Sequence, residues 1–132
     1  MLKELTVKTS SRTEFVLVDQ KVTGVVKESG VTEGICVLWV PHTTAAVTIN
    51  ENADPDVVRD ILYETDKIVP FQDGYHHSEG NSAAHIKSSL FNPSLSLIIT
   101  NSELVLGTWQ SIYFCEFDGP RTRRLLVKIM GD

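Results

Sequence analysis

Short apolar segments separated by brief polar turns constrain the fold of this chain more than any other feature. Gly34–Val40 and Ala45–Ile49 have the length and the apolar, β-branched content of strands. Leu95–Thr100, Leu104–Leu106 and Arg123–Met130 continue the pattern through the last third of the chain. No helical pattern separates these last segments, so we expect mainly antiparallel pairing.

Three stretches carry helical signals instead. Valines at helical spacing in residues 22–26 precede Gly30, which stands where a helix C-cap would. The run Asp54-Pro55-Asp56 can open a second helix, because aspartate accepts free N–H groups and proline fits the first turn. A third helix is expected over residues 82–91, capped at Asn81 or the next residue.

The order of these elements predicts one α+β domain over residues 1–132, with about three helices. Leu5–Lys8 and Phe15–Val18 flank the turn Thr9-Ser10-Ser11, which favours a hairpin between them. Gln110–Phe117 alternates polar and apolar residues, which is typical of a strand with one solvated face.

Composition excludes several function classes. The formal net charge of -5 and the low aromatic content of 8% disfavour nucleic-acid binding. No apolar run approaches the roughly 20 residues that span a bilayer, and the N-terminus has no apolar signal segment. We therefore expect a cytoplasmic protein without a membrane partner. Cys36 and Cys115 lie in apolar runs and are interpreted as buried free thiols, although sequence alone leaves a disulfide open.

Histidines in polar segments are the strongest candidates for chemistry. His42 follows a strand at Pro41, whereas His77 and His85 belong to one loop and the helix after it. Neutral imidazole is a common ligand of zinc, and three ligands plus an open position are usual in catalytic sites. The alternative is that each imidazole is a hydrogen-bonded structural residue. Of the adjacent residues His76 and His77, His76 is interpreted as the weaker candidate and as a solvated side chain.

Other polar residues could complete a site. Glu51 ends an apolar strand and could transfer a proton or orient a ligand, or it could be an exposed loop charge. The helix start at Asn81 and the arginines of residues 121–124 suit an anion such as phosphate. The arginines could equally offset nearby acids. Trp109 could wall a pocket or lie in the core.

Three long motifs resemble the YjbQ family over nearly the whole chain. They are His42-Thr43-Thr44-Ala45-Ala46-Val47-Thr48-Ile49-Asn50-Glu51-Asn52, the stretch from His77-Ser78-Glu79-Gly80-Asn81 through His85-Ile86-Lys87, and Leu106-Gly107-Thr108-Trp109-Gln110 continuing through Phe114-Cys115-Glu116-Phe117-Asp118-Gly119-Pro120-Arg121. The resemblance implies a compact α+β domain that assembles as a homotrimer, with a histidine site near subunit contacts that is compatible with a metal. It also implies secondary thiamine-phosphate synthase activity, which joins a pyrimidine methyl diphosphate to a thiazole phosphate.

The resemblance matches the following residues by position, and we expect these roles for them. The candidate metal ligands are His42, His77 and His85, holding a divalent ion such as zinc. The candidate catalytic residues are Glu51, His85 and Glu116, with Glu51 expected to transfer a proton. The candidate substrate-binding residues are Asn81, Trp109 and Arg121.

The leading hypothesis is a small-molecule enzyme that acts on phosphorylated heterocycles. Two alternatives remain at this point. The same residues could hydrolyse a phosphoester or another ester with metal-bound water. They could also form a non-catalytic trimer that binds an anionic metabolite.

Overall fold

Two antiparallel sheets form the body of the protein in a computed structural model that describes all of residues 1–132. The larger sheet has the strand order β1-β8-β3-β5-β6, and the smaller has the order β2-β7-β4. The strands are β1 (Leu2–Lys8), β2 (Glu14–Leu17), β3 (Gly34–Trp39), β4 (Ala45–Glu51), β5 (Ser94–Thr100), β6 (Glu103–Leu104), β7 (Gln110–Glu116) and β8 (Thr122–Gly131). The helices are α1 (Asp19–Ser29), α2 (Pro55–Ile68) and α3 (Ser82–Leu90). The predicted α+β class with three helices is confirmed.

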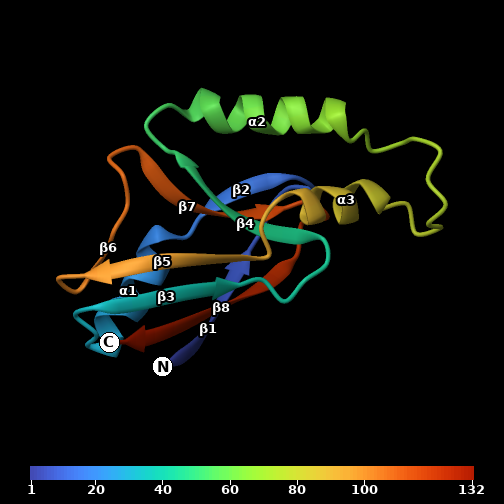
Figure 1. The fold of residues 1–132 in the computed structure, drawn as a ribbon. Helices are drawn as coiled ribbons and strands as arrows, with labels where there is room; N and C mark the ends of the chain where they lie inside the picture. Colours follow the sequence, from blue (N-terminus) through green and yellow to red (C-terminus); the bar gives the residue numbers. More distant parts are fainter.

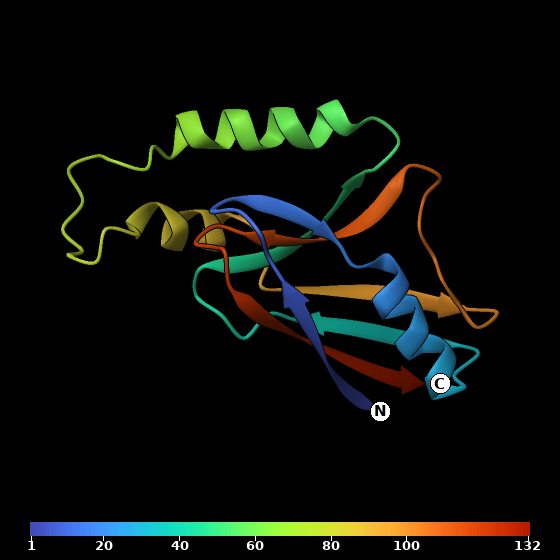
Figure 2. The ribbon, with the colours of Figure 1, turned by 180° about the vertical axis from the view of Figure 1, so that it is seen from behind.

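The two sheets face each other across the main core, and α2 and α3 lie on the outer side of the smaller sheet (Figures 1 and 2). Alternate residues of the strands point into this core, among them Leu38, Phe114 and Leu125. The valines of α1 join them, as their helical spacing predicts. A second, smaller cluster lies on the other face of the smaller sheet, where Tyr113 and Cys115 pack with Ala84 of α3.

Strand β7 is buried on both faces, which differs from the predicted polar and apolar alternation. Ile112 and Phe114 enter the main core, while Tyr113 and Cys115 enter the second cluster. Because β7 is the central strand of its sheet and both sides are covered, even its polar residue Ser111 is buried. The two cysteines are free and lie in different clusters, as their interpretation as buried thiols predicts.

The predicted hairpin between the first two strands is wrong. Strand β1 pairs with β8 in the larger sheet, and β2 pairs with β7 in the smaller one. The chain crosses between sheets at Thr9–Thr13, where the carboxylate of Glu14 accepts N–H groups of Ser10 and Ser11. The backbone N–H groups of Ser10 and Ser11 therefore find a hydrogen-bond acceptor close by in the chain. The apolar faces of the two strands cover the core from opposite sides.

The local signals Asp54 and Gly30 at the helix ends are confirmed. Asp54 accepts the N–H of Asp56 at 2.9 Å and caps α2. Gly30 ends α1 with φ of 69°, a left-handed conformation that glycine adopts at low cost. Asn101 and Ser102 have positive φ in the two-residue link between β5 and β6, which matches the twist of a tight hairpin. No helix is long and apolar enough to cross a membrane.

Candidate functional site

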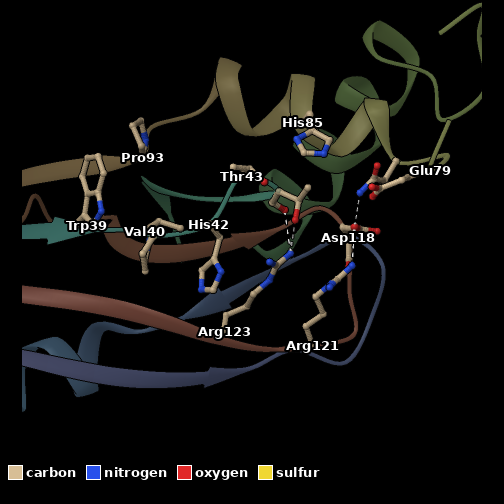
Figure 3. Close-up of a pocket in the computed structure, with 13 residues that line it drawn as sticks. Trp39, Val40, His42, Thr43, Glu79, His85, Pro93, Asp118, Arg121 and Arg123 are labelled. Atoms are coloured by element: carbon tan, nitrogen blue, oxygen red, sulfur yellow. Dashed lines mark hydrogen bonds and ion pairs between the residues drawn. The ribbon is translucent and has the colours of Figure 1, made fainter. Parts of the chain in front are cut away.

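A polar cleft of about 620 Å³ lies where four segments converge. These segments are the link between β3 and β4, the start of α3, the link between α3 and β5, and the turn between β7 and β8 (Figure 3). The lining residues are Trp39, Val40, Pro41, His42, Thr43, Thr44, Glu79, Asn81, His85, Pro93, Asp118, Arg121 and Arg123. Four of the residues expected at a site from the sequence, His42, Asn81, His85 and Arg121, therefore come together.

His42 is held as a neutral hydrogen-bond donor. The backbone N–H of Arg124 donates to Nε2 of His42 at 2.9 Å, so the neutral ring carries its proton on Nδ1. Burial lowers the pKa of His42, and the charges of Arg123 and Arg124 lower it further. Pro41 has no N–H to extend the β3 ladder, and the chain leaves the sheet there, which places the imidazole at the strand end.

A buried ion pair forms the floor beside His42. Glu116 and Arg123 have side chains that are 0% and 5% exposed. Nε of Arg123 donates to both carboxylate oxygens of Glu116, at 2.9 and 3.2 Å. Its Nη2 donates to Glu116, to Oγ1 of Thr44 at 2.8 Å and to the Thr44 carbonyl at 3.2 Å. Glu116 is thus a supporting residue behind the cleft rather than one that lines it.

Several donors surround the Glu116 carboxylate. Oγ1 of Thr9 donates to it at 2.7 Å, and the backbone N–H of Asp118 donates at 3.0 Å. Burial raises the pKa of Glu116, but the hydrogen bonds from Arg123, Asp118 and Thr9 outweigh burial, so the pKa lies below its ordinary value. The pair is therefore ionised at neutral pH.

Asp118 joins the start of α3 to the β7–β8 turn. Its Oδ2 accepts Nδ2 of Asn81 at 3.0 Å and Nη2 of Arg121 at 2.9 Å (Figure 3). Asn81 directly precedes α3, its side chain makes no cap bond, and its Nδ2 donates to Asp118. Oδ1 of Asn81 is fully buried and has no hydrogen-bond partner.

Gly119 allows this turn to pack closely. A Cβ at that position would lie 2.3 Å from the carbonyl oxygen of Ser11 and 2.7 Å from Cγ of Glu116. Both distances are shorter than any ordinary contact, so a larger residue would displace the turn that carries Asp118 and Arg121.

The three candidate metal ligands do not gather around one point. His42 lines the cleft, whereas His77 lines a separate cavity of about 380 Å³. His85 lines both, and its ring meets that of His77 edge to face at 5.4 Å between centroids. No group of three or more His, Cys, Asp or Glu side chains in the chain is arranged to hold a metal ion. The residues of one chain thus do not fit the expected three-histidine site, and His42 already uses Nε2 for Arg124.

Glu51 and Trp109 lie away from the cleft. Glu51 is the last residue of β4, about 20 Å along that strand from its first residue, which follows the cleft segment. Trp109 precedes β7, its side chain is exposed, and its carbonyl accepts the N–H of Asn52 at 2.9 Å. Neither residue lines the cleft, so the chemistry of the cleft includes neither the expected proton transfer by Glu51 nor the expected substrate contact of Trp109.

Sequence reasoning gave too little weight to Arg123, Asp118 and Glu79, which line the cleft. One signal could have singled out Arg123. Arg123 alternates along β8 with Leu125, Val127 and Ile129, so its side chain points to the same face of the strand. These three residues are buried. A charge at an inward strand position must be paired, which implies a buried partner such as Glu116.

Comparisons with known proteins agree with this fold. The family model described as UPF0047 protein YjbQ-like matches residues 3–132. The chain is 50% identical to the UPF0047 protein YugU of Bacillus subtilis, with 99% of this chain and all of the relative aligned. It is 49% identical to the UPF0047 protein MJ1081 of Methanocaldococcus jannaschii, with coverage of 100% and 96%.

Solved structures extend the similarity. A YjbQ/UPF0047 protein from Clostridium acetobutylicum is 55% identical and superimposes with a TM-score of 0.95, covering 97% of this chain and 99% of that one. A YbjQ-like protein of unknown function from Sulfolobus solfataricus is 30% identical and also reaches 0.95, covering 100% of this chain and 97% of that one. With its sequence motifs, its full-length match and its superimposable fold, the chain belongs to the YjbQ-like UPF0047 family.

Proposed function

We propose that the protein is a small-molecule enzyme that binds a phosphorylated heterocycle in the cleft between α3 and the β7–β8 turn. The observation that carries this proposal is the convergence of two imidazoles and two guanidinium groups on one cleft. His42 and His85 supply groups that can transfer protons, and Arg121 and Arg123 supply donors for phosphate oxygens. The reaction we propose first is of the thiamine-phosphate-synthase type, following the family resemblance.

The two ends of the cleft suit different parts of such a substrate. Trp39, Val40 and Pro93 form an apolar wall at one end, against which a planar ring can pack (Figure 3). Polar groups of Arg121, Arg123 and Asn81 occupy the remainder. The start of α3 adds the partial positive charge of a helix N-terminus.

The proposed chemistry needs charge stabilisation more than a nucleophile from the protein. The bond between the pyrimidine methyl carbon and the diphosphate oxygen breaks, and a bond from that carbon to the thiazole nitrogen forms. The diphosphate leaves with both electrons of the broken bond, and guanidinium groups stabilise its charge. The neutral Nδ1–H of His42 can donate a hydrogen bond to the departing oxygen.

A divalent ion such as zinc remains a prediction from the resemblance. Such an ion would supply Lewis-acid stabilisation of the diphosphate. Because three ligands do not converge within one chain, none of the steps above depends on it. Elemental analysis of the purified protein, and of the His85→Ala variant, checks the prediction directly.

The homotrimer is likewise proposed from the resemblance, and one surface supports it. Ile35 and its cross-strand neighbours Ile98 and Met130 are 44%, 63% and 45% exposed on the outer face of the larger sheet. Leu2 and Trp39 are also exposed, and Trp39 also lines the cleft. Apolar side chains gathered in this way are typical of an interaction surface, and association here would bring a second chain close to the cleft.

The test of the proposed function is direct product formation. Purified protein is incubated with pyrimidine methyl diphosphate and thiazole phosphate, and thiamine phosphate and released diphosphate are quantified. We expect both products, and we expect His85→Ala and His42→Ala to lower the rate by about 100-fold or more, the usual contribution of acid–base groups. His76→Ala is the matched control, since His76 is exposed and does not line the cleft.

Other outcomes would redirect the proposal. Release of phosphate from a single phosphoester, with no requirement for the second heterocycle, would identify a hydrolase. Binding without turnover of any phosphorylated substrate would identify a binding protein. Either result contradicts the transferase.

A further inference from the structure

The two arginines that line the cleft differ in how firmly they are held. Arg121 is half exposed, with its Nε on the Asp118 carbonyl at 2.7 Å and its Nη2 on the Asp118 carboxylate at 2.9 Å. Both partners belong to the same surface turn, three residues away along the chain. An ion pair with a guanidinium that is half exposed contributes little and reorganises readily. Arg121 is therefore poorly preorganised for a ligand.

The Arg123 guanidinium is fixed and has one nitrogen free. Its hydrogen bonds to Glu116 and Thr44 use Nε and Nη2 only, and none of them uses Nη1. Among the fully enclosed side-chain nitrogen and oxygen atoms, only Oδ1 of Asn81 lacks a hydrogen-bond partner. Nη1 of Arg123 also lacks a partner, so this nitrogen is not fully enclosed. Because Arg123 lines the cleft, its two remaining N–H donors are accessible from there.

The surroundings of Arg123 favour an anion at this point. Glu116 does not line the cleft, and its hydrogen bonds to Nε and Nη2 hold the guanidinium in one orientation. His42, beside Arg123, is neutral and carries a proton on Nδ1 (Figure 3). The carboxylates of Asp118 and Glu79 line the other end of the cleft, beside Arg121 and the start of α3, and they would repel a phosphate there.

We infer that Arg123 anchors the anionic group of the ligand through Nη1, and that Glu116 and Thr44 are positioning residues that aim it. This inference rests on the proposed function for the identity of the cleft, and it assigns the phosphate to Arg123 rather than to Arg121. A guanidinium already locked in place loses little side-chain entropy on binding. Lysine cannot reproduce the arrangement, because a single ammonium cannot satisfy Glu116 and Thr44 and still present a fork to the ligand.

Inorganic pyrophosphate is the probe for the test. Its affinity for the wild type and for Arg123→Lys, Arg121→Lys and Arg124→Lys is measured by calorimetry. We expect Arg123→Lys to weaken binding by about tenfold or more, as loss of hydrogen bonds to a charged group does. Arg124→Lys is the matched control on the same strand, because its side chain is exposed on the outer face and pairs with Glu4 at 2.9 Å.

Arg124→Lys should change the affinity by less than about twofold, since exposed and screened charges act weakly. Arg121→Lys should fall between the other two variants. Wild-type affinity in Arg123→Lys, or a larger loss in Arg121→Lys, overturns the inference. Absence of pyrophosphate binding to the wild type also overturns it.

A crystal structure keeps the test independent of variant folding and of turnover, and steady-state kinetics test the positioning role of Glu116. A crystal structure of the wild type with pyrophosphate should place an anion oxygen within hydrogen-bond distance of Nη1 of Arg123, and an anion bound elsewhere contradicts the inference. The role of Glu116 is read from the KM for the phosphorylated substrate in Glu116→Gln, which should rise more than kcat falls. If pyrophosphate binds on Arg123 but no product forms, the inference about Arg123 stands and the proposed function fails. If product forms at an unchanged rate in Arg123→Lys, the proposed function stands and the inference about Arg123 fails.

Discussion

At the scale of single residues, the Glu116–Arg123 pair explains how a charged site can sit beside an apolar core. Each partner lies on an inward position of a strand, and both side chains are buried apart from the edge of Arg123 that lines the cleft. A buried charge without its partner is strongly unfavourable, so each side chain requires the other. The core and the cleft therefore share the strands β7 and β8.

Stability should depend on the ionisation of Glu116 in a defined pH window. Its folded pKa lies below the ordinary value of 4.5, so the unfolded chain binds the proton more readily. The ionised carboxylate therefore contributes stability above pH 4.5, and the contribution is lost as pH falls through the folded pKa. Urea unfolding of the wild type and Glu116→Gln at several pH values should show a difference at pH 7 that shrinks below pH 4.5. A difference that is independent of pH would contradict this.

Gly119 provides a second test at this scale. Gly119→Ala places a Cβ against the Ser11 carbonyl and Glu116, and should lower the free energy of unfolding by about 1–3 kcal/mol. It should also weaken pyrophosphate binding, because the Cβ would displace Glu116, which positions Arg123. Gly74→Ala is the control: a Cβ there meets nothing within 4 Å, so its effect should stay within about 0.5 kcal/mol. Equal stability of the two variants would show that the turn tolerates a side chain.

At the scale of elements, α2 is the least firmly packed. It has no buried residue within its bounds, and Val58 packs only at the edge of the second cluster. The ammonium of Lys87 on α3 pairs with Asp66 of α2, and the Lys87 side chain is only 6% exposed. This ion pair is therefore a main attachment of α2 to the body.

Lys87→Met should loosen α2 while the sheets stay intact. Loss of a hydrogen bond between charged groups costs about 1.5 kcal/mol, so amides of α2 should exchange about tenfold faster. Hydrogen exchange followed by NMR measures this element by element. Lys67→Met is the control, because its ammonium is 3.7 Å from Glu64 and both side chains are exposed. Unchanged exchange in Lys87→Met would show that apolar contacts alone hold the helix.

At the scale of the whole molecule, the exposed apolar face of the larger sheet predicts association. Ile98→Glu puts a charge beside Ile35 on that face and should convert the proposed trimer to monomers, since an unpaired charge is costly in an interface. Analytical ultracentrifugation reports the mass. Tyr63→Glu is the control, because Tyr63 is 65% exposed on α2, away from the sheet. A wild type that sediments as a monomer would contradict the trimer itself.

The sequence by itself determined the elements and most of their ends. Asp54 and Gly30 act through the backbone within a few residues, so their effects can be read locally. The candidates His42 and His85 were found from polar residues near a strand end and a helix start, but the same signal also singled out Glu51, which does not line the cleft.

Only the tertiary structure decided which strands pair and which side chains meet. Strands β1 and β2 share no ladder although a short turn joins them, because the partner of each lies more than 90 residues away in the sequence. The same long-range pairing brings Arg123 against Thr44 and separates His77 from His42. Local periodicity gives the direction in which a side chain points, but its neighbours follow from the burial of the whole core, which no short segment encodes.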